Sequence, residues 1–117
     1  MKIYAFDVDE TLEVSGGPIL MERLAELHNF GHVVGLCGNW AVVVRGISAW
    51  FQFISFLGPM AITKADFLKQ LKTYIPSDDY MMVGNVLGVS GQSDDKGAAD
   101  EAGWRFIQEQ AFADGER

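Results

Sequence analysis

Two carboxylates, Asp7 and Asp9, end a short apolar run at residues 3–8 that is typical of a buried strand. In an extended chain, side chains two residues apart point the same way, so these carboxylates face one side. Two carboxylates held so close together repel each other unless a cation or a shared proton offsets their negative charges. Mg²⁺ prefers oxygen ligands, and a carboxylate can attack phosphorus to give an aspartyl-phosphate. The pair therefore predicts a Mg²⁺-dependent phosphoryl-transfer site with Asp7 as its nucleophile.

Alternating strands and helices are expected to position this pair. Apolar runs predict strands at residues 3–8, 33–37, 52–57, 80–83 and 104–107. Helical spacing of apolar residues predicts helices at residues 19–30, 41–50, 65–74 and 96–102. This alternation predicts an α/β fold, a three-layer doubly wound parallel sheet of about five strands. We expect one domain over residues 1–117, with no cap domain and a frayed tail at 108–117.

Polar and small residues gather where the predicted strands end. In a doubly wound sheet, ligands bind outside the carboxyl ends of the strands, near the switch in strand order. Lys64 would balance charge on a phosphate and on the nucleophile, and Gly38 would let backbone N–H groups approach phosphate oxygens. The candidates at these strand ends and helix starts are Asp7, Asp9, Cys37, Gly38, Asn39, Lys64, Asn85, Asp94 and Asp95.

The composition narrows the classes of partner. A net charge of −7 and a pI of about 4.6 predict no binding to a nucleic-acid backbone or to an anionic membrane surface. The most apolar stretch, residues 40–62, contains Arg45 and Pro59, so it predicts buried elements rather than a membrane span. Cys37 is the only cysteine, which excludes an intramolecular disulfide and suits a cytoplasmic location.

An aromatic-rich segment follows the second predicted strand. Most of its aromatic side chains are expected in the core, and any that form an exposed patch would mark a homo-oligomer interface. These residues are Trp40, Trp50, Phe51, Phe53 and Phe56.

The first strand and its carboxylates resemble the haloacid dehalogenase-like (HAD) superfamily. Its first motif is an apolar strand followed by Asp-x-Asp-x-Thr, which here is Asp7-Val8-Asp9-Glu10-Thr11. The resemblance implies that Asp7 is the nucleophile and Asp9 the general acid and base. It also implies that the Asp7 carboxylate and the Asp9 backbone carbonyl bind Mg²⁺. Thr11 would either contact the phosphate or cap a turn.

Three further motifs extend the resemblance over residues 3 to 107. The second places Cys37, Gly38 and Asn39 beside the phosphate, with Cys37 where the family has Thr or Ser. Cys37 is alternatively a small buried apolar residue, and Asn39 alternatively caps the next helix. The third motif is Lys64.

The fourth motif is a strand, then Gly-Asp, then an Asp before a helix, and here Asn85 replaces the first Asp. Asn85 would be a metal ligand through its amide oxygen, or a turn residue. The segment Asp-x-x-Ala-Ala-x-x-Ala-Gly selects Asp95 over Asp94 as the second metal-site carboxylate, although a helix N-cap is its alternative role.

Together these residues predict a capless HAD-like phosphatase that uses Mg²⁺ and an aspartyl-phosphate intermediate. A site without a cap is open, so the phosphorylated substrate would be large, or a neighbouring subunit would close the site. The departures at Cys37 and Asn85 keep a second hypothesis open. In it, the chain is a weakly active or inactive relative that binds a metal or a phosphate ligand, or serves as an assembly module.

Overall fold

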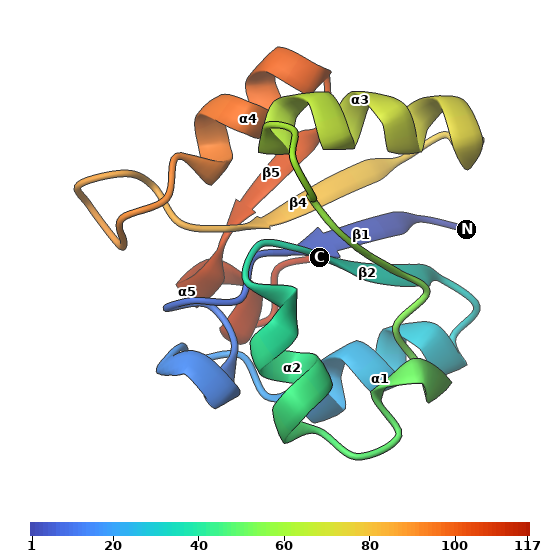
Figure 1. Ribbon diagram of the computed structural model, residues 1–117, viewed down its shortest axis with the longest axis vertical. Coiled ribbons are helices and arrows are strands. Elements are labelled where there is room, and N and C mark those ends of the chain that lie inside the picture. Colours follow the sequence, from blue (N-terminus) through green and yellow to red (C-terminus); the bar gives the residue numbers. More distant parts are fainter.

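A five-stranded, all-parallel sheet forms the centre of the computed structural model, which describes residues 1–117 (Figure 1). The strand order is β3-β2-β1-β4-β5. Helices flank the sheet and no cap is present, so the predicted α/β fold class is confirmed. The strands are β1 (Ile3–Phe6), β2 (Val33–Cys37), β3 (Phe56–Gly58), β4 (Tyr80–Gly84) and β5 (Arg105–Gln108).

Five α-helices cover the two faces of the sheet. Figure 1 shows α3 (Lys64–Tyr74) and α4 (Asp95–Ala102) on one side, and α1 (Met21–Asn29) and α2 (Trp40–Gly46) on the other. The short helix α5 (Glu109–Ala113) packs with α1 and α2, because Phe112 belongs to the same buried cluster as Leu24 and Val43. Each helix is too short or too polar to cross a bilayer.

The strand β1 lies between both helical layers and is therefore apolar at every position. Its side chains alternate, so that Tyr4 and Phe6 join the cluster with α1 while Ile3 and Ala5 join the cluster with α3 and α4. None is more than 1% exposed. Burying one large apolar side chain contributes roughly 1.5–3 kcal/mol, so this strand anchors the residues that follow it.

The segment between β2 and α3 differs from the prediction. The helix predicted at 41–50 ends at Gly46, and a 3₁₀ turn at Trp50–Gln52 replaces the start of the strand predicted at 52–57. Ile47 is extended (φ −114°, ψ 111°) and ends α2, and Ala49 adopts a left-handed conformation (φ 57°) just before the 3₁₀ turn. The strand β3 is therefore only three residues long.

The tail also differs from the prediction. Residues 108–117 were expected to fray, but α5 forms there and Phe112 is fully buried. The Phe112 ring meets Phe6 edge to face, with ring centroids 5.2 Å apart, and the Arg117 guanidinium lies 3.9 Å from its centroid. This apolar anchor orders a segment whose composition is polar.

The strand order reverses between β1 and β4. Phe6 pairs with Leu36 of β2 on one side and with Val83 of β4 on the other. Since the strands are parallel, the residues after Phe6, Cys37 and Gly84 meet at one edge of the sheet. That edge, at the switch in strand order, is where such folds bind ligands.

Candidate functional site

A single lysine joins two buried carboxylates at this edge. The Lys64 Nζ lies 2.9 Å from Asp7 Oδ1 and 2.7 Å from Asp95 Oδ1. Asp7 follows β1, Lys64 begins α3 and Asp95 begins α4. The Thr63 hydroxyl accepts a hydrogen bond from the Asp66 N–H, which caps α3 and fixes where Lys64 stands. The Lys64 side chain remains 24% exposed, so the trio reaches the surface at one point.

Burial and pairing set the charges of this trio. Burial raises the pKa of Asp7 from its usual 3.8 to about 6, Lys64 opposes this rise, and Asp95 adds to it. Burial alone would lower the pKa of Lys64, but the two carboxylates raise it above its ordinary value. At pH 7 Lys64 is therefore charged, and Asp7, whose pKa lies below 7, is mostly ionised. The ionised form is the one that a nucleophile requires.

Thr11 holds the other oxygen of Asp7. The Thr11 hydroxyl donates to Asp7 Oδ2 at 3.3 Å, and Thr11 is fully buried. It therefore orients the predicted nucleophile, a role that neither of the two sequence-based alternatives for Thr11 included.

Gly38 also lies against Asp7. A Cβ at position 38 would stand 2.4 Å from Asp7 Oδ1, so only glycine fits there. The Gly38 N–H donates to the Gly58 carbonyl at 2.8 Å. This N–H is therefore paired within the sheet, and the predicted approach of other backbone N–H groups to a phosphate at Gly38 stays a prediction.

Asp9 and Asn39 occupy the solvent side of the site. Asp9 is exposed, and the Asn39 amide nitrogen lies 3.4 Å from both of its carboxylate oxygens. Asn39 stands at the N-terminus of α2 but makes no side-chain capping bond there. The alternative role of Asn39 as a helix cap is therefore wrong, and its side chain supports Asp9 instead.

Cys37 lies in the core, close enough to Lys64, Asp7 and Asp95 for their charges to act on its thiol. Its side chain is fully buried in the cluster that contains Ile3, Ala5 and Leu68. Burial raises the pKa of the Cys37 thiol to about 12, so the thiol stays protonated. The thiol has no exposed surface, so the alternative role of Cys37 as a small buried apolar residue is confirmed.

The two candidate acids before α4 have separate roles. Asp94 Oδ1 accepts a hydrogen bond from the Gly97 N–H and caps the helix. Asp95 is fully buried, and its Oδ2 accepts from the Asn85 N–H at 2.8 Å. Asp95 thus ties the start of α4 to the end of β4, and its remaining oxygen is the one that binds Lys64.

Asn85 carries the one buried side-chain nitrogen or oxygen that has no hydrogen-bond partner, its Oδ1. Leaving a buried acceptor unsatisfied costs about 1–3 kcal/mol, so this atom is suited to a cation or a donor supplied by a ligand. No three His, Cys, Asp or Glu side chains converge on one point. The predicted metal residues offer mixed oxygens for a cation: the Asp7 and Asp95 carboxylates, the Asp9 carbonyl and Asn85 Oδ1. The oxygen chemistry of these groups suits Mg²⁺.

Sequence reasoning missed Glu109, which contacts Asn85. Glu109 begins α5 and is only 5% exposed, and its Oε2 accepts from Asn85 Nδ2 at 2.9 Å. The only local signal for it was the apolar pair Ala111 and Phe112 in the presumed tail, since Ile107 belongs to β5.

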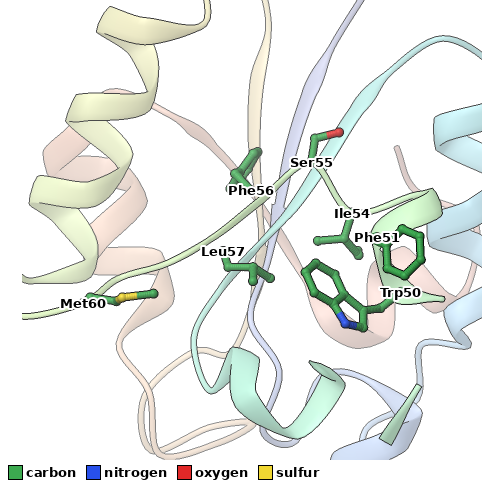
Figure 2. A pocket seen from close by; sticks show the side chains of 7 residues that line it. All are labelled: Trp50, Phe51, Ile54, Ser55, Phe56, Leu57 and Met60. Carbon is green, nitrogen blue, oxygen red and sulfur yellow. The ribbon is translucent and has the colours of Figure 1, made fainter. Parts of the chain in front are cut away.

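An apolar pocket lies along the edge strand β3, and Figure 2 shows the side chains that line it. Phe51 and Met60 are 67% and 63% exposed there. The pocket contains no titratable group, so it could contact an apolar partner but has no side chain for acid–base or nucleophilic catalysis. Its lining consists of Trp50, Phe51, Ile54, Ser55, Phe56, Leu57 and Met60.

Five of the predicted site residues form one continuous set of hydrogen bonds: Thr11, Asp7, Lys64, Asp95 and Asn85. Comparisons with protein-family models, curated proteins and solved structures gave no match. The chemistry of these residues is therefore the basis for a function.

Proposed function

We propose that the protein is a Mg²⁺-dependent phosphatase of the capless HAD-like type, acting through an aspartyl-phosphate on Asp7. The observation that carries the proposal is the placement of Lys64 between Asp7 and Asp95 at the switch in strand order. A buried, ionised carboxylate held by a lysine and a threonine hydroxyl is suited to in-line attack on phosphorus. A buried ion pair alone is weak evidence, but its position at the strand ends favours chemistry.

The reaction proceeds in two balanced steps. A carboxylate oxygen of Asp7 attacks phosphorus, the ester P–O bond breaks, and Asp9 gives a proton to the leaving oxygen. Asp9 then takes a proton from water, the water oxygen attacks phosphorus, and the bond to Asp7 breaks to release inorganic phosphate. Asp9 suits this role because it is exposed and is supported by Asn39. Lys64 offsets negative charge on the phosphoryl oxygens.

A cation would complete this site. Mg²⁺ supplies positive charge to the phosphoryl oxygens when bound. The Asp7 carboxylate and Asn85 Oδ1 would hold it together with the Asp9 backbone carbonyl. Support for this assignment comes from the partnerless Asn85 Oδ1. Each Asp95 oxygen accepts one hydrogen bond, from Lys64 and from the Asn85 N–H, so Asp95 holds these two residues and keeps lone pairs for the cation, as Asp7 does.

The open site favours a large phosphorylated substrate. The cytoplasmic location is proposed separately, because Cys37 is the only cysteine and no disulfide is possible. No cap covers the strand ends, so substrate specificity would come from loops 12–17, 58–63 and 86–94. A homo-oligomer remains a prediction, supported by the exposed Phe51 and Met60 beside β3. Analytical ultracentrifugation of wild type and Phe51→Ser tests it, and a monomer at all concentrations would contradict it.

A second candidate is a ligand-binding relative without turnover. The specific observation that favours it is that neither Cys37 nor the Gly38 N–H is available to hold a phosphate oxygen. Such a protein would bind Mg²⁺ or a phosphate analogue through Asp7 and Lys64 and release no phosphate.

Phosphate release from a panel of phosphate esters separates the two candidates. The phosphatase predicts release that requires Mg²⁺, stops with EDTA and is lost in Asp7→Asn. Asp78→Asn is the matched control, since Asp78 is an exposed carboxylate outside the site. Mg²⁺ binding without turnover across the panel would favour the ligand-binding candidate.

A further inference from the structure

Glu109 is a buried carboxylate that the proposed reaction does not use. It is 5% exposed, and its Oε2 accepts hydrogen bonds from Asn85 Nδ2 at 2.9 Å and from the Ser90 hydroxyl at 3.2 Å. The Ser90 hydroxyl in turn accepts from the Val86 N–H, which folds the loop after β4 over this pair. Glu109 is thus paired with an amide and a hydroxyl rather than with a lysine or an arginine.

The surroundings of Asn85 fix the direction of its amide. Its Nδ2 lies between two pure acceptors, the Glu109 carboxylate and the Glu10 carbonyl, the latter at 3.4 Å. Rotating the amide by half a turn would place Oδ1 against both acceptors, so the nitrogen must face Glu109. A Cβ at Gly91 would stand 2.6 Å from Asn85 Cγ, so the loop also closes on this amide. The atom left without a partner is Oδ1.

We infer that Glu109 is a positioning residue: it holds and polarises the Asn85 amide so that Oδ1 serves as a ligand for the cation of the active site. The inference rests on the proposed function for the identity of that cation. Donating a hydrogen bond to a carboxylate shifts electron density onto the amide oxygen and strengthens it as a ligand. The Asn85–Glu109 pair therefore supplies, in two residues, the single negative charge that an aspartate at 85 would supply alone.

This pairing also explains why an aspartate is disfavoured at position 85. A carboxylate there would face Glu109 Oε2 at the distance now spanned by the 2.9 Å hydrogen bond, with both groups buried. When two carboxylates lie so close together, ionising both has a large cost in free energy. The negative charge can be moved from position 109 to position 85 only if the residue at 109 becomes a hydrogen-bond donor. Asn85→Asp with Glu109→Gln makes that exchange and keeps the net charge of the pair.

Calorimetric titration with Mg²⁺ tests the inference, alongside melting curves recorded in EDTA. We expect Glu109→Gln to weaken Mg²⁺ binding by about 10–100-fold, as loss of a hydrogen-bond partner of a metal ligand typically does. The double variant Asn85→Asp/Glu109→Gln should recover affinity to within about threefold of wild type, because the new amide donates to the new carboxylate. Asp114→Asn, an exposed carboxylate beside the same helix, is the matched control and should leave affinity unchanged.

A folded Glu109→Gln protein with wild-type affinity would overturn the inference, as would a double variant that binds no better than Glu109→Gln. A purely structural role would lower the melting temperature in EDTA and leave the affinity of the folded protein unchanged. If Glu109→Gln fails to fold, Glu109→Asp keeps the charge but moves it away from Asn85, and weaker Mg²⁺ binding is again expected.

The same titrations separate the inference from the proposed function. Mg²⁺ binding that depends on Glu109 without any turnover would support the inference while contradicting the phosphatase. Absence of Mg²⁺ binding in wild type would overturn both.

Discussion

The Lys64 ammonium lies 2.9 Å from Oδ1 of Asp7, although 57 residues separate them in the chain. The fold brings them together because Asp7 follows the central strand β1 and Lys64 begins the helix that crosses from the edge strand β3 to β4. Lys64 also holds Asp95, so one cation serves two buried carboxylates. The trio therefore carries one net negative charge when both acids are ionised, which attracts a further cation.

Removing Lys64 should destabilise the protein strongly. Lys64→Ala leaves Asp7 and Asp95 buried without their cation, and breaking a buried pair in this way costs about 3–5 kcal/mol. Urea unfolding followed by tryptophan fluorescence measures the change in the free energy of unfolding. Lys69→Ala is the control on the same helix, because Lys69 pairs with Glu101 at the exposed surface and its loss should cost less than about 1 kcal/mol. Equal losses in the two variants would contradict the buried trio.

Ionisation of Asp7 should make stability fall with rising pH. The folded-state pKa of about 6 lies above the unfolded value near 3.8, so between these values the folded state retains a proton that the unfolded state has lost. The contribution of protonated Asp7 is therefore complete below about pH 4 and lost above about pH 6. We expect the free energy of unfolding of wild type, measured in EDTA, to fall by up to about 3 kcal/mol relative to that of Asp7→Asn between these pH values. A constant difference between the two stability curves would show that the pKa of Asp7 is not raised.

Gly38→Ala should disable the site through Asp7. The added methyl would stand 2.4 Å from Asp7 Oδ1, so the carboxylate must leave its place beside Lys64. A displacement of about 1 Å at a reacting group costs on the order of 10²-fold in rate, which the phosphate-release assay would detect. Gly46→Ala is the control, since a Cβ at Gly46 meets nothing within 4 Å. Its stability should stay the same or rise by up to about 1 kcal/mol.

Cys37 should resist thiol reagents in the folded protein. Its pKa is raised from 9.0 to about 12, which lowers the thiolate fraction near neutral pH by about 10³-fold, and the side chain is fully buried. Labelling with a disulfide reagent should therefore be slow in buffer and rapid in urea. Fast labelling of the native protein would place the thiol at the surface.

The sequence predicted the elements with strong local patterns. The strand β2 occupies the predicted residues 33–37, because its run of apolar residues is bounded by polar His32 and by Gly38. The boundary of β3 was wrong because it depends on the left-handed Ala49 and on pairing with β2, neither of which leaves a local pattern. The same pairing occupies the Gly38 N–H, a contact with Gly58 that the motif does not show.

At the candidate site, residues at element ends were predictable and long-range contacts were not. Asp7, Lys64 and Asp95 each end a strand or begin a helix, so the fold class alone places them at one edge. The sequence did not predict a role for Glu109, because α5 is stabilised by packing of Phe112 against Tyr4 and Phe6 from the other end of the chain. Helix propensity over five residues is too weak to reveal such an element.

Trapping the phosphorylated enzyme tests the central claim most directly. Wild type is mixed with a ³²P-labelled phosphate ester and Mg²⁺, quenched in acid during turnover, and digested to locate the label. The account predicts an acyl-phosphate on the peptide that contains Asp7, labile to hydroxylamine and absent from Asp7→Asn. Phosphate release without protein-bound label, or release that survives Asp7→Asn, would contradict Asp7 as the nucleophile.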